Sequence, residues 1–138
     1  MAEPTVFIVD DHEGVRDSIA ELVDSVGLRH ASFPSAAAFL DGFDPAAPGC
    51  LVLDVRMAHM SGPQLQERLA AMGAHLPIVF VSAHADIDVA VRTIRAGAVD
   101  FVTKPYRDQQ LLDSINEALA RDVAERAAPG AGGAFGAR

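Results

Sequence analysis

The strongest constraint on the fold is an alternation of short apolar runs with segments of helical periodicity. Five runs are rich in apolar and β-branched residues, and they cover residues 5–10, 28–33, 50–54, 77–82 and 99–104. Five segments that follow them repeat apolar residues at spacings of three and four. Continuous apolar runs such as CLVLD and PIVFVS are typical of parallel strands buried on both faces. We therefore predict an α/β fold, a doubly wound five-stranded parallel sheet flanked by five helices.

Local signals place the ends and faces of the helices. Ser35 is a predicted N-cap of the second helix, and Ser61 with Gln64 has the spacing of a capping box at the start of the third. Gly27 and Gly97 supply stop signals after the first and fourth helices. The apolar positions that predict the faces of the fourth and fifth helices are Ile87, Ala90, Val91, Ile94, Leu111, Leu112, Ile115 and Leu119.

Composition limits the classes of protein that remain. The chain has 138 residues, 50% of them hydrophobic and 22% charged, as expected for one globular domain with a single sizeable core. A net charge of -8 argues against direct nucleic-acid binding, which needs clustered Lys and Arg. The single cysteine cannot form an internal disulfide, and there is no signal-peptide pattern or membrane-spanning apolar run, so we expect a soluble, cytoplasmic protein. Residues 126–138 are rich in Ala and Gly and predict a flexible tail after a domain of residues 1–125.

Polar or charged residues end four of the five predicted strands. Asp10 and Asp11 end the first strand, Asp54 the third, Ser82 the fourth and Lys104 the fifth. In a doubly wound sheet these ends meet at one rim, where ligands bind. Clustered carboxylates repel and raise one another's pKa unless a cation holds them, which favours a Mg²⁺ site. Each residue alone could equally be a helix cap or a solvated group; the coincidence across four strands favours a site.

The motifs FIVDDHEGVR, LVLDVRM, FVSAHAD and DFVTKPY, in this order, resemble the receiver domain of two-component response regulators, the CheY-like superfamily. The resemblance covers about residues 4–122 and is nearest in style to receivers of the FixJ/NarL type. It implies the strand order 2-1-3-4-5. It also implies a phosphorelay partner, either a sensor histidine kinase or a phosphotransfer protein.

The resemblance assigns a role to each rim residue. Asp54 is the implied phosphoacceptor; Asp11 and Asp54 bind Mg²⁺ with the backbone carbonyl of Arg56, and Asp10 acts mainly through water. Lys104 pairs with a phosphoryl oxygen, and the Ser82 hydroxyl moves to bond another. Phe101 then changes rotamer and repacks the surface around the fourth helix. The resemblance also implies a cis peptide between Lys104 and Pro105.

Several positions remain open. Ala58 stands where the family commonly has proline, which predicts a less rigid loop. Arg56 and His84 either tune the lifetime of the phosphoryl group or are solvated rim residues. The five histidines lack the close spacings of a zinc site, so we expect them to form no metal set, and Cys50 is expected in the core.

Three classes of function are compatible with this pattern. The first is a phosphorylation-switched receiver, a signalling domain whose only chemistry is Mg²⁺-dependent self-phosphorylation and slow autodephosphorylation. The second is a pseudo-receiver that binds partners without phosphorylation, and the intact set of rim residues speaks against it. The third is a haloacid-dehalogenase phosphatase, which needs an acid where Arg56 stands.

The output of the domain is open at this point. No DNA-binding helix pair follows the fifth helix, so the chain is either a stand-alone regulator or a receiver excised from a longer protein. The fourth helix carries Asp86, Asp88, Arg92 and Arg95, a mixed-charge face that is either an ordinary solvated surface or half of a two-fold dimer. We expect phosphorylation to drive dimerisation through the fourth helix and fifth strand.

Overall fold

Five parallel strands form one sheet. The computed structural model describes residues 3–128. The strands are β1 (Thr5–Val9), β2 (Arg29–Phe33), β3 (Gly49–Asp54), β4 (Ile78–Ser82) and β5 (Asp100–Thr103). Their order in the sheet is β2-β1-β3-β4-β5, and every neighbouring pair is parallel. The predicted fold class and strand order are confirmed.

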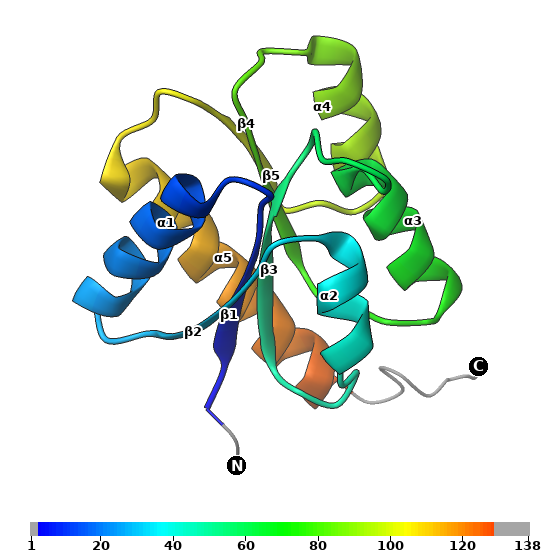
Figure 1. Cartoon of the computed structure of the whole chain (residues 1–138). Coiled ribbons are helices and arrows are strands. Elements are labelled where there is room, and N and C mark those ends of the chain that lie inside the picture. The colour runs from blue at the N-terminus through cyan, green and yellow to red at the C-terminus, as the bar shows by residue number, and fades with distance from the viewer. Residues whose placement is uncertain (1–2, 129–138) are drawn as a thin grey trace.

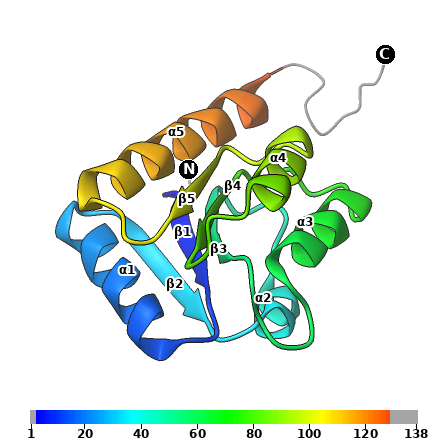
Figure 2. The ribbon, with the colours of Figure 1, turned by 90° about the horizontal axis from the view of Figure 1, so that it is seen from above.

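Helices cover both faces of the sheet. They are α1 (Glu13–Ser25), α2 (Ala36–Gly42), α3 (Gly62–Ala71), α4 (Ile87–Arg95) and α5 (Asp108–Ala127). Figures 1 and 2 show α1 and α5 on one face and α2, α3 and α4 on the other. The predicted caps are present: Ser35 accepts from the backbone N–H of Ala38, and Ser61 and Gln64 form the capping box. Helices α2 and α3 therefore begin where the capping residues predict.

The core has two layers, one on each side of the sheet. Every residue of β3 and β4 is buried, as expected for central strands, whereas β2 at the edge is mostly exposed. On the face covered by α1 and α5, Ile19 and Ile115 pack with strand residues such as Val52, and Cys50 belongs to the same layer, as predicted. On the other face, Phe39 and Leu65 pack against residues such as Leu53. The central strands are thus held from both sides.

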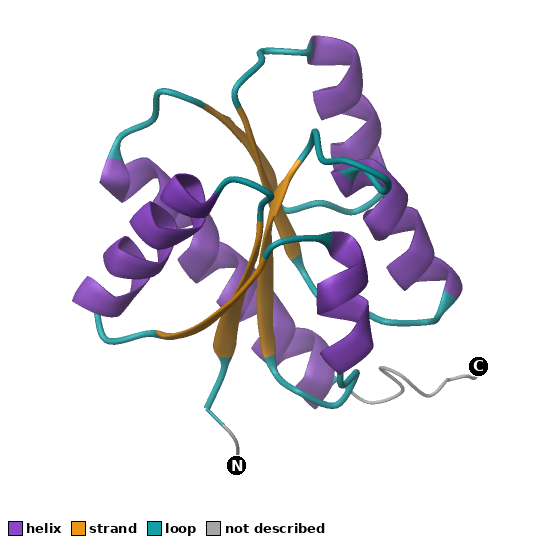
Figure 3. Ribbon diagram, in the orientation of Figure 1, coloured by secondary structure: helices purple, strands orange, loops and turns teal. Residues whose placement is uncertain are grey.

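The loops that follow the five strands lie together at one end of the sheet, where the carboxyl ends of the strands meet. Figure 3 shows these loops leading from the strand ends to the helices. Strands β1 and β3 are neighbours, yet β1 leads to α1 on one face and β3 leads to α3 on the other. Parallel sheets bind ligands where neighbouring connections diverge in this way. This topology therefore predicts a binding site beside the carboxyl ends of β1 and β3.

The orientation of α4 differs from the prediction. Its apolar residues Ile87, Val91 and Ile94 are exposed by 76%, 43% and 42%. The buried position is Thr93, whose hydroxyl donates to the carbonyl of Ala90 and whose own carbonyl accepts from the side chain of Gln66 on α3. Three of the four residues predicted to face the core are therefore exposed, whereas Ala90 is half-buried. An apolar stripe is left uncovered in the described chain.

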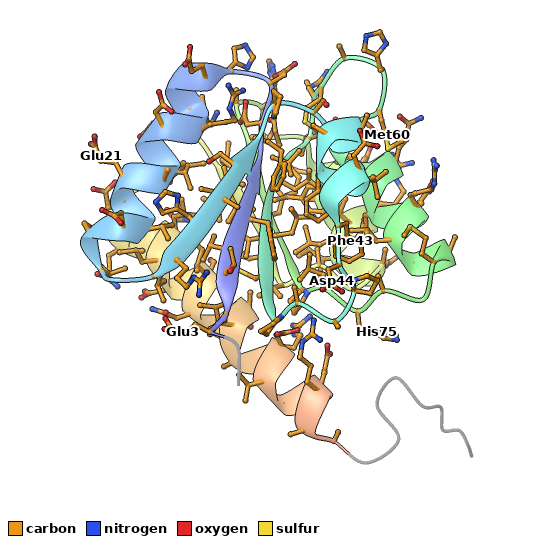
Figure 4. The ribbon with its side chains drawn as sticks, turned by 60° about the horizontal axis from the view of Figure 1, so that its bottom comes forward. Glu3, Glu21, Phe43, Asp44, Met60 and His75 are labelled. Atoms are coloured by element: carbon orange, nitrogen blue, oxygen red, sulfur yellow. The ribbon has the colours of Figure 1, made fainter. Side chains whose placement is uncertain are left out.

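The last helix extends beyond the predicted end of the domain. α5 runs to Ala127, so residues 126 and 127 are helical where we expected a tail; residues 129–138 lie outside the described residues. Arg126 ties this end down, because its guanidinium pairs with Asp122 and donates to the carbonyl of Ala47 at 2.8 Å. Figure 4 labels Phe43 and Asp44, which directly precede the residues 45–47 whose carbonyls accept from Arg126. Across the described chain, no helix is long and apolar enough to cross a membrane.

Candidate functional site

The rim at the carboxyl ends of the strands holds the residues that the sequence singled out. Asp10 follows β1 directly, Asp54 and Ser82 are the last residues of β3 and β4, and Lys104 follows β5. Asp10 is only 2% exposed and Asp54 8%, whereas Asp11 lies on the surface. Two carboxylates are therefore held inside the protein at the divergence between β1 and β3.

The turn after β1 fixes Asp10 and its neighbour. The Asp10 carboxylate accepts a hydrogen bond from the backbone N–H of His12 at 2.9 Å. The carbonyl of Asp10 accepts from the guanidinium of Arg16, on the first turns of α1, at 2.8 Å. An aspartate that bonds the backbone two residues ahead is a common way to close a turn. Asp10 is thus positioned by its own turn and by α1, and Asp11 follows at the mouth of the site.

The carboxylates of the rim lie close enough to share one ion. One oxygen from each of Asp10, Asp11 and Asp54 and one ring nitrogen of His12 all lie within 4.8 Å of one another. The pKa of Asp54 is raised to about 6, first by burial and then by the charges of Asp10 and Asp11. Lys104 and the backbone N–H of Arg56 act in the opposite direction. The cluster is therefore electrostatically unfavourable as it stands, which suits a bound cation.

His12 is a member of the cluster that the sequence analysis missed. Its Nδ1 lies 3.0 Å from the Asp11 carboxylate and 3.4 Å from that of Asp10. We expected the histidines to form no metal set because we compared them only with one another. The available signal was the position of His12 immediately after two aspartates at a strand end. His12 thus adds one imidazole nitrogen beside the three aspartates that the sequence analysis named.

The other side of the rim holds the predicted switch residues. The Ser82 hydroxyl donates to the carbonyl of His84 and accepts from its N–H, both at 3.0 Å. The backbone N–H of Lys104 donates to the carbonyl of Ser82 at 2.8 Å, which joins the ends of β4 and β5. The peptide bond between Lys104 and Pro105 is cis, as the resemblance implied. Phe101 is half-buried, with its ring centroid 6.3 Å from that of Phe80.

Comparison with known proteins gives this arrangement a family. The model of the response regulator receiver domain matches residues 6–116. The chain belongs to that family.

Relatives and solved structures agree with this assignment. The response regulator protein TmoT from Ectopseudomonas mendocina is 50% identical over 117 residues, which cover 85% of this chain and 53% of that protein. The transcriptional regulatory protein TdiR from Thauera aromatica is 48% identical over 124 residues, covering 88% and 55%. The structure of the response regulator StyR matches with a TM-score of 0.86 and 46% identity, over 91% of this chain and 63% of that one.

These matches define what the chain is and how much of a regulator it spans. It is a receiver domain of the kind found in two-component response regulators, whose general role is to be phosphorylated by a kinase. The chain spans about half the length of the curated relatives named above. Because the chain belongs to the receiver family, it is not a member of the haloacid-dehalogenase phosphatases considered from the sequence.

The loop between β3 and α3 shapes the receiver beside Asp54. Gly62 begins α3, and a Cβ at this position would overlap the backbone oxygen of Asp54, so only glycine lets the helix start so close to the strand end. The sequence analysis did not single out this glycine. Its neighbour Ser61 marked the helix start, but the close approach to Asp54 is visible only in three dimensions.

Two further loop residues have defined neighbours. The Arg56 guanidinium lies 3.9 Å from the carboxylate of Asp86, the N-cap of α4, so it bridges the loop after β3 to the start of α4. Both side chains are partly exposed, and an ion pair of this kind contributes little to stability. Arg56 is thus a rim residue with a partner, and its effect on the lifetime of a phosphoryl group stays a prediction, as does the effect of Ala58 on loop rigidity.

Proposed function

We propose that this receiver accepts a phosphoryl group on Asp54 from the phosphohistidine of a sensor histidine kinase or of a phosphotransfer protein. Membership of the family supplies the class of reaction. The gathering of Asp10, Asp11 and Asp54 at the ends of two neighbouring strands supports the choice of residue. With a pKa of about 6, Asp54 is mainly ionised above pH 7, as a carboxylate nucleophile must be.

The chemistry needs positioning and charge neutralisation. An oxygen of Asp54 attacks phosphorus while the bond from phosphorus to the histidine nitrogen breaks, and that nitrogen keeps the electron pair. The transition state is loose and carries its charge on the equatorial phosphoryl oxygens. Lys104, which is close enough to lower the pKa of Asp54, pairs with one of these oxygens. We expect no further enzymatic activity beyond self-phosphorylation from small donors and slow loss of the phosphoryl group.

The donor set of the rim suits Mg²⁺. Its ligands are mainly carboxylate oxygens, which hard divalent cations prefer. Asp11 and Asp54 would hold the ion directly together with the backbone carbonyl of Arg56, and Asp10 would act mainly through water. Bound there, Mg²⁺ supplies positive charge that offsets the carboxylates and the incoming phosphoryl oxygens.

Phosphorylation changes the partners of Ser82. In the unphosphorylated protein its hydroxyl is bonded to the backbone of His84. We propose that it exchanges this bond for one to a phosphoryl oxygen, and that Phe101 turns inward into the space left behind. The adjacent helix α4 has one buried residue, Thr93, so it is lightly anchored and can respond. The switch therefore acts on the surface that α4 presents.

The uncovered stripe of α4 supports a partner surface there. Ile87, Val91 and Ile94 are exposed, and Arg92 and Arg95 lie on the same helix with Asp88. An isologous dimer can cover such a stripe on both copies while pairing the charges with their opposites. We propose that phosphorylated receivers dimerise through α4 and β5. The acidic charge of the chain makes direct contact of this domain with DNA unfavourable.

The setting of the domain follows from its partners. A cytoplasmic location suits a receiver that must meet a kinase, and we propose it on that ground. We also propose that residues 1–125, with the last turn of α5, make up the receiver. Relatives named as transcriptional regulatory proteins are about twice as long as the matched region, which supports a role within a longer regulator of transcription.

Acetyl phosphate with Mg²⁺ tests the proposed function. Intact-mass spectrometry should find one added phosphate on the wild type and none on Asp54→Asn. Asp41→Asn, a change at an exposed residue of α2, is the matched control and should label like the wild type. Equal labelling of Asp54→Asn would refute the choice of acceptor. A wild type that takes no phosphate from either acetyl phosphate or a phosphohistidine donor would instead indicate a pseudo-receiver.

A further inference from the structure

The imidazole of His12 lies beside the carboxylates without being packed in place. Its side chain is 74% exposed, and its Nδ1 lies 3.0 Å from an oxygen of Asp11. The backbone is fixed, however, because the N–H of His12 donates to Asp10 at 2.9 Å. The ring is therefore anchored at the mouth of the acidic cluster and free to rotate about its side-chain bonds.

The separations in the cluster suit a single ion with His12 among its ligands. Two ligands on opposite sides of an ion lie apart by twice the metal–ligand distance, or about 4.2 Å for bonds near 2.1 Å. The atoms of Asp10, Asp11, His12 and Asp54 lie within 4.8 Å of one another. The largest of these separations exceeds that span by well under an ångström, so the imidazole of His12 can join the aspartates around one ion, with Asp10 acting through water.

A nitrogen ligand changes which ions a site prefers. Carboxylate and carbonyl oxygens suit Mg²⁺ and Ca²⁺, whereas imidazole suits Zn²⁺, Ni²⁺ and related transition metals. We propose that His12 is an additional metal ligand of this site and that it raises the affinity of the receiver for transition-metal ions relative to its affinity for Mg²⁺. This inference rests on the proposed function, since it places its ion among the same aspartates.

A competing explanation is that His12 only donates a hydrogen bond to Asp11. The substitution His12→Gln separates the two, because glutamine keeps a donor and an oxygen of similar reach but removes the nitrogen that binds transition metals. Exposed histidines also bind Ni²⁺ weakly without a site, so a control histidine is needed. His75, labelled in Figure 4, precedes β4 and so lies at the end of the sheet opposite the rim. The substitution His75→Gln serves as that control.

Calorimetric titration of the full chain with Ni²⁺ and with Mg²⁺ tests the proposal. His12→Gln should weaken Ni²⁺ binding by roughly tenfold or more, the loss that follows when even a supporting group of a metal site is removed. Its Mg²⁺ affinity should stay within about twofold of the wild type, and His75→Gln should change neither. The absorption spectrum of bound Co²⁺ should also shift in His12→Gln, because nitrogen and oxygen ligands differ in field strength.

The outcomes separate the inference from the proposed function. Equal Ni²⁺ affinity in the wild type and His12→Gln, or an equal loss for Ni²⁺ and Mg²⁺, would overturn the role of His12 as a nitrogen ligand. Asp11→Ala should weaken both ions. If the wild type bound neither ion, both the metal site of the proposed function and the role of His12 would be wrong, whereas normal Mg²⁺ binding with unaltered Ni²⁺ binding in His12→Gln would remove only the latter.

Discussion

Two buried aspartates at opposite ends of the sheet have contrasting surroundings. Asp122, on α5, is 1% exposed, and its carboxylate accepts from the backbone N–H of Gly49 and from the guanidinium of Arg126, all at 2.9 Å. Asp54, at the carboxyl end of β3, is 8% exposed and has Asp10 and Asp11 beside it. One carboxylate has a full set of donors, and the other is surrounded by like charges.

The contrast separates an aspartate that holds parts of the fold together from the proposed phosphoacceptor. The pair of Asp122 and Arg126 joins the end of α5 to the start of β3, and every donor it needs comes from the chain. Lys104 and one backbone N–H stabilise the charged form of Asp54, but they do not offset burial and two neighbouring acids. The pKa of Asp54 is therefore raised to about 6. A protein tolerates such a cluster where a ligand will complete it. The following substitutions test that distinction.

The largest effect on stability should come from the structural pair. Arg126→Ala leaves the Asp122 carboxylate buried without its cation and frees three loop carbonyls, so we expect the free energy of unfolding to fall by roughly 2–4 kcal/mol. Urea unfolding followed by circular dichroism measures the change. Phosphorylation from acetyl phosphate should remain in the folded variant. A change below about 0.5 kcal/mol, the size typical of a surface substitution, would show that the pair contributes no more than an exposed one.

A smaller effect of opposite sign should come from the rim. Without divalent ions at pH 7.5, Asp54→Asn removes one of three like charges and should raise the free energy of unfolding by roughly 1–3 kcal/mol. Asparagine keeps an acceptor for the N–H of Arg56. Asp41→Asn is the control and should have little effect. A destabilised Asp54→Asn would mean that the negative charge of Asp54 stabilises the fold, contrary to the comparison.

The pH dependence of the free energy of unfolding tests the same destabilising effect of the Asp54 charge over a range of conditions. The pKa of Asp54 is raised in the folded protein to about 6, from an ordinary value of 3.8, so the folded state holds this proton more tightly. Its contribution to stability is therefore fully present below about pH 4 and is lost as pH rises through 6. The difference in unfolding free energy between Asp54→Asn and the wild type should grow over this range. A difference that is flat with pH would contradict the raised pKa.

The smallest expected change in free energy concerns self-association. A beryllofluoride mimic bound at the rim should convert monomer to dimer in sedimentation, because the proposed switch through Ser82 and Phe101 changes the surface of α4. Val91→Ser, a change on the exposed stripe of α4, should weaken the dimer, whereas Arg126→Ala, at the other end of the molecule, should not. A monomer in both states would contradict the proposed dimer, and the exposed stripe of α4 would then be expected to bind another protein.

The sequence predicted correctly which residues stand at the carboxyl ends of four strands, because each of these apolar runs ends at a polar or charged residue. Apolar runs ending in Asp54, Ser82 or Lys104 leave little choice of position once the sheet is parallel. It predicted the inner face of α4 wrongly at Ile87, Val91 and Ile94, because an apolar stripe indicates a helix face but not the element that covers it. The hydroxyl of the buried Thr93 is satisfied within the helix by the carbonyl of Ala90. His12 and Gly62 escaped notice for a related reason: their importance comes from what other strands bring next to them.

The structural pair was also beyond reach from sequence. Asp122 and Arg126 have the spacing of an ordinary exposed helix pair. Only Asp122 is buried, and Gly49, which is far away in the chain, supplies the backbone N–H from which its carboxylate accepts a hydrogen bond. The sequence therefore assigned a role to Asp54 at its strand end but none to Asp122, whose hydrogen-bond partners are known only from the structure.

Stability measured against Mg²⁺ concentration tests the central distinction most directly. Binding of the ion to the folded state at the rim should raise the free energy of unfolding, by about 2.7 kcal/mol when the free ion is at 100 times its dissociation constant. The wild type and Arg126→Ala should both show this rise, and Asp11→Ala should lose it while remaining folded. If the wild type ignored Mg²⁺, or if Asp11→Ala responded as the wild type does, the rim carboxylates would not be the cation site.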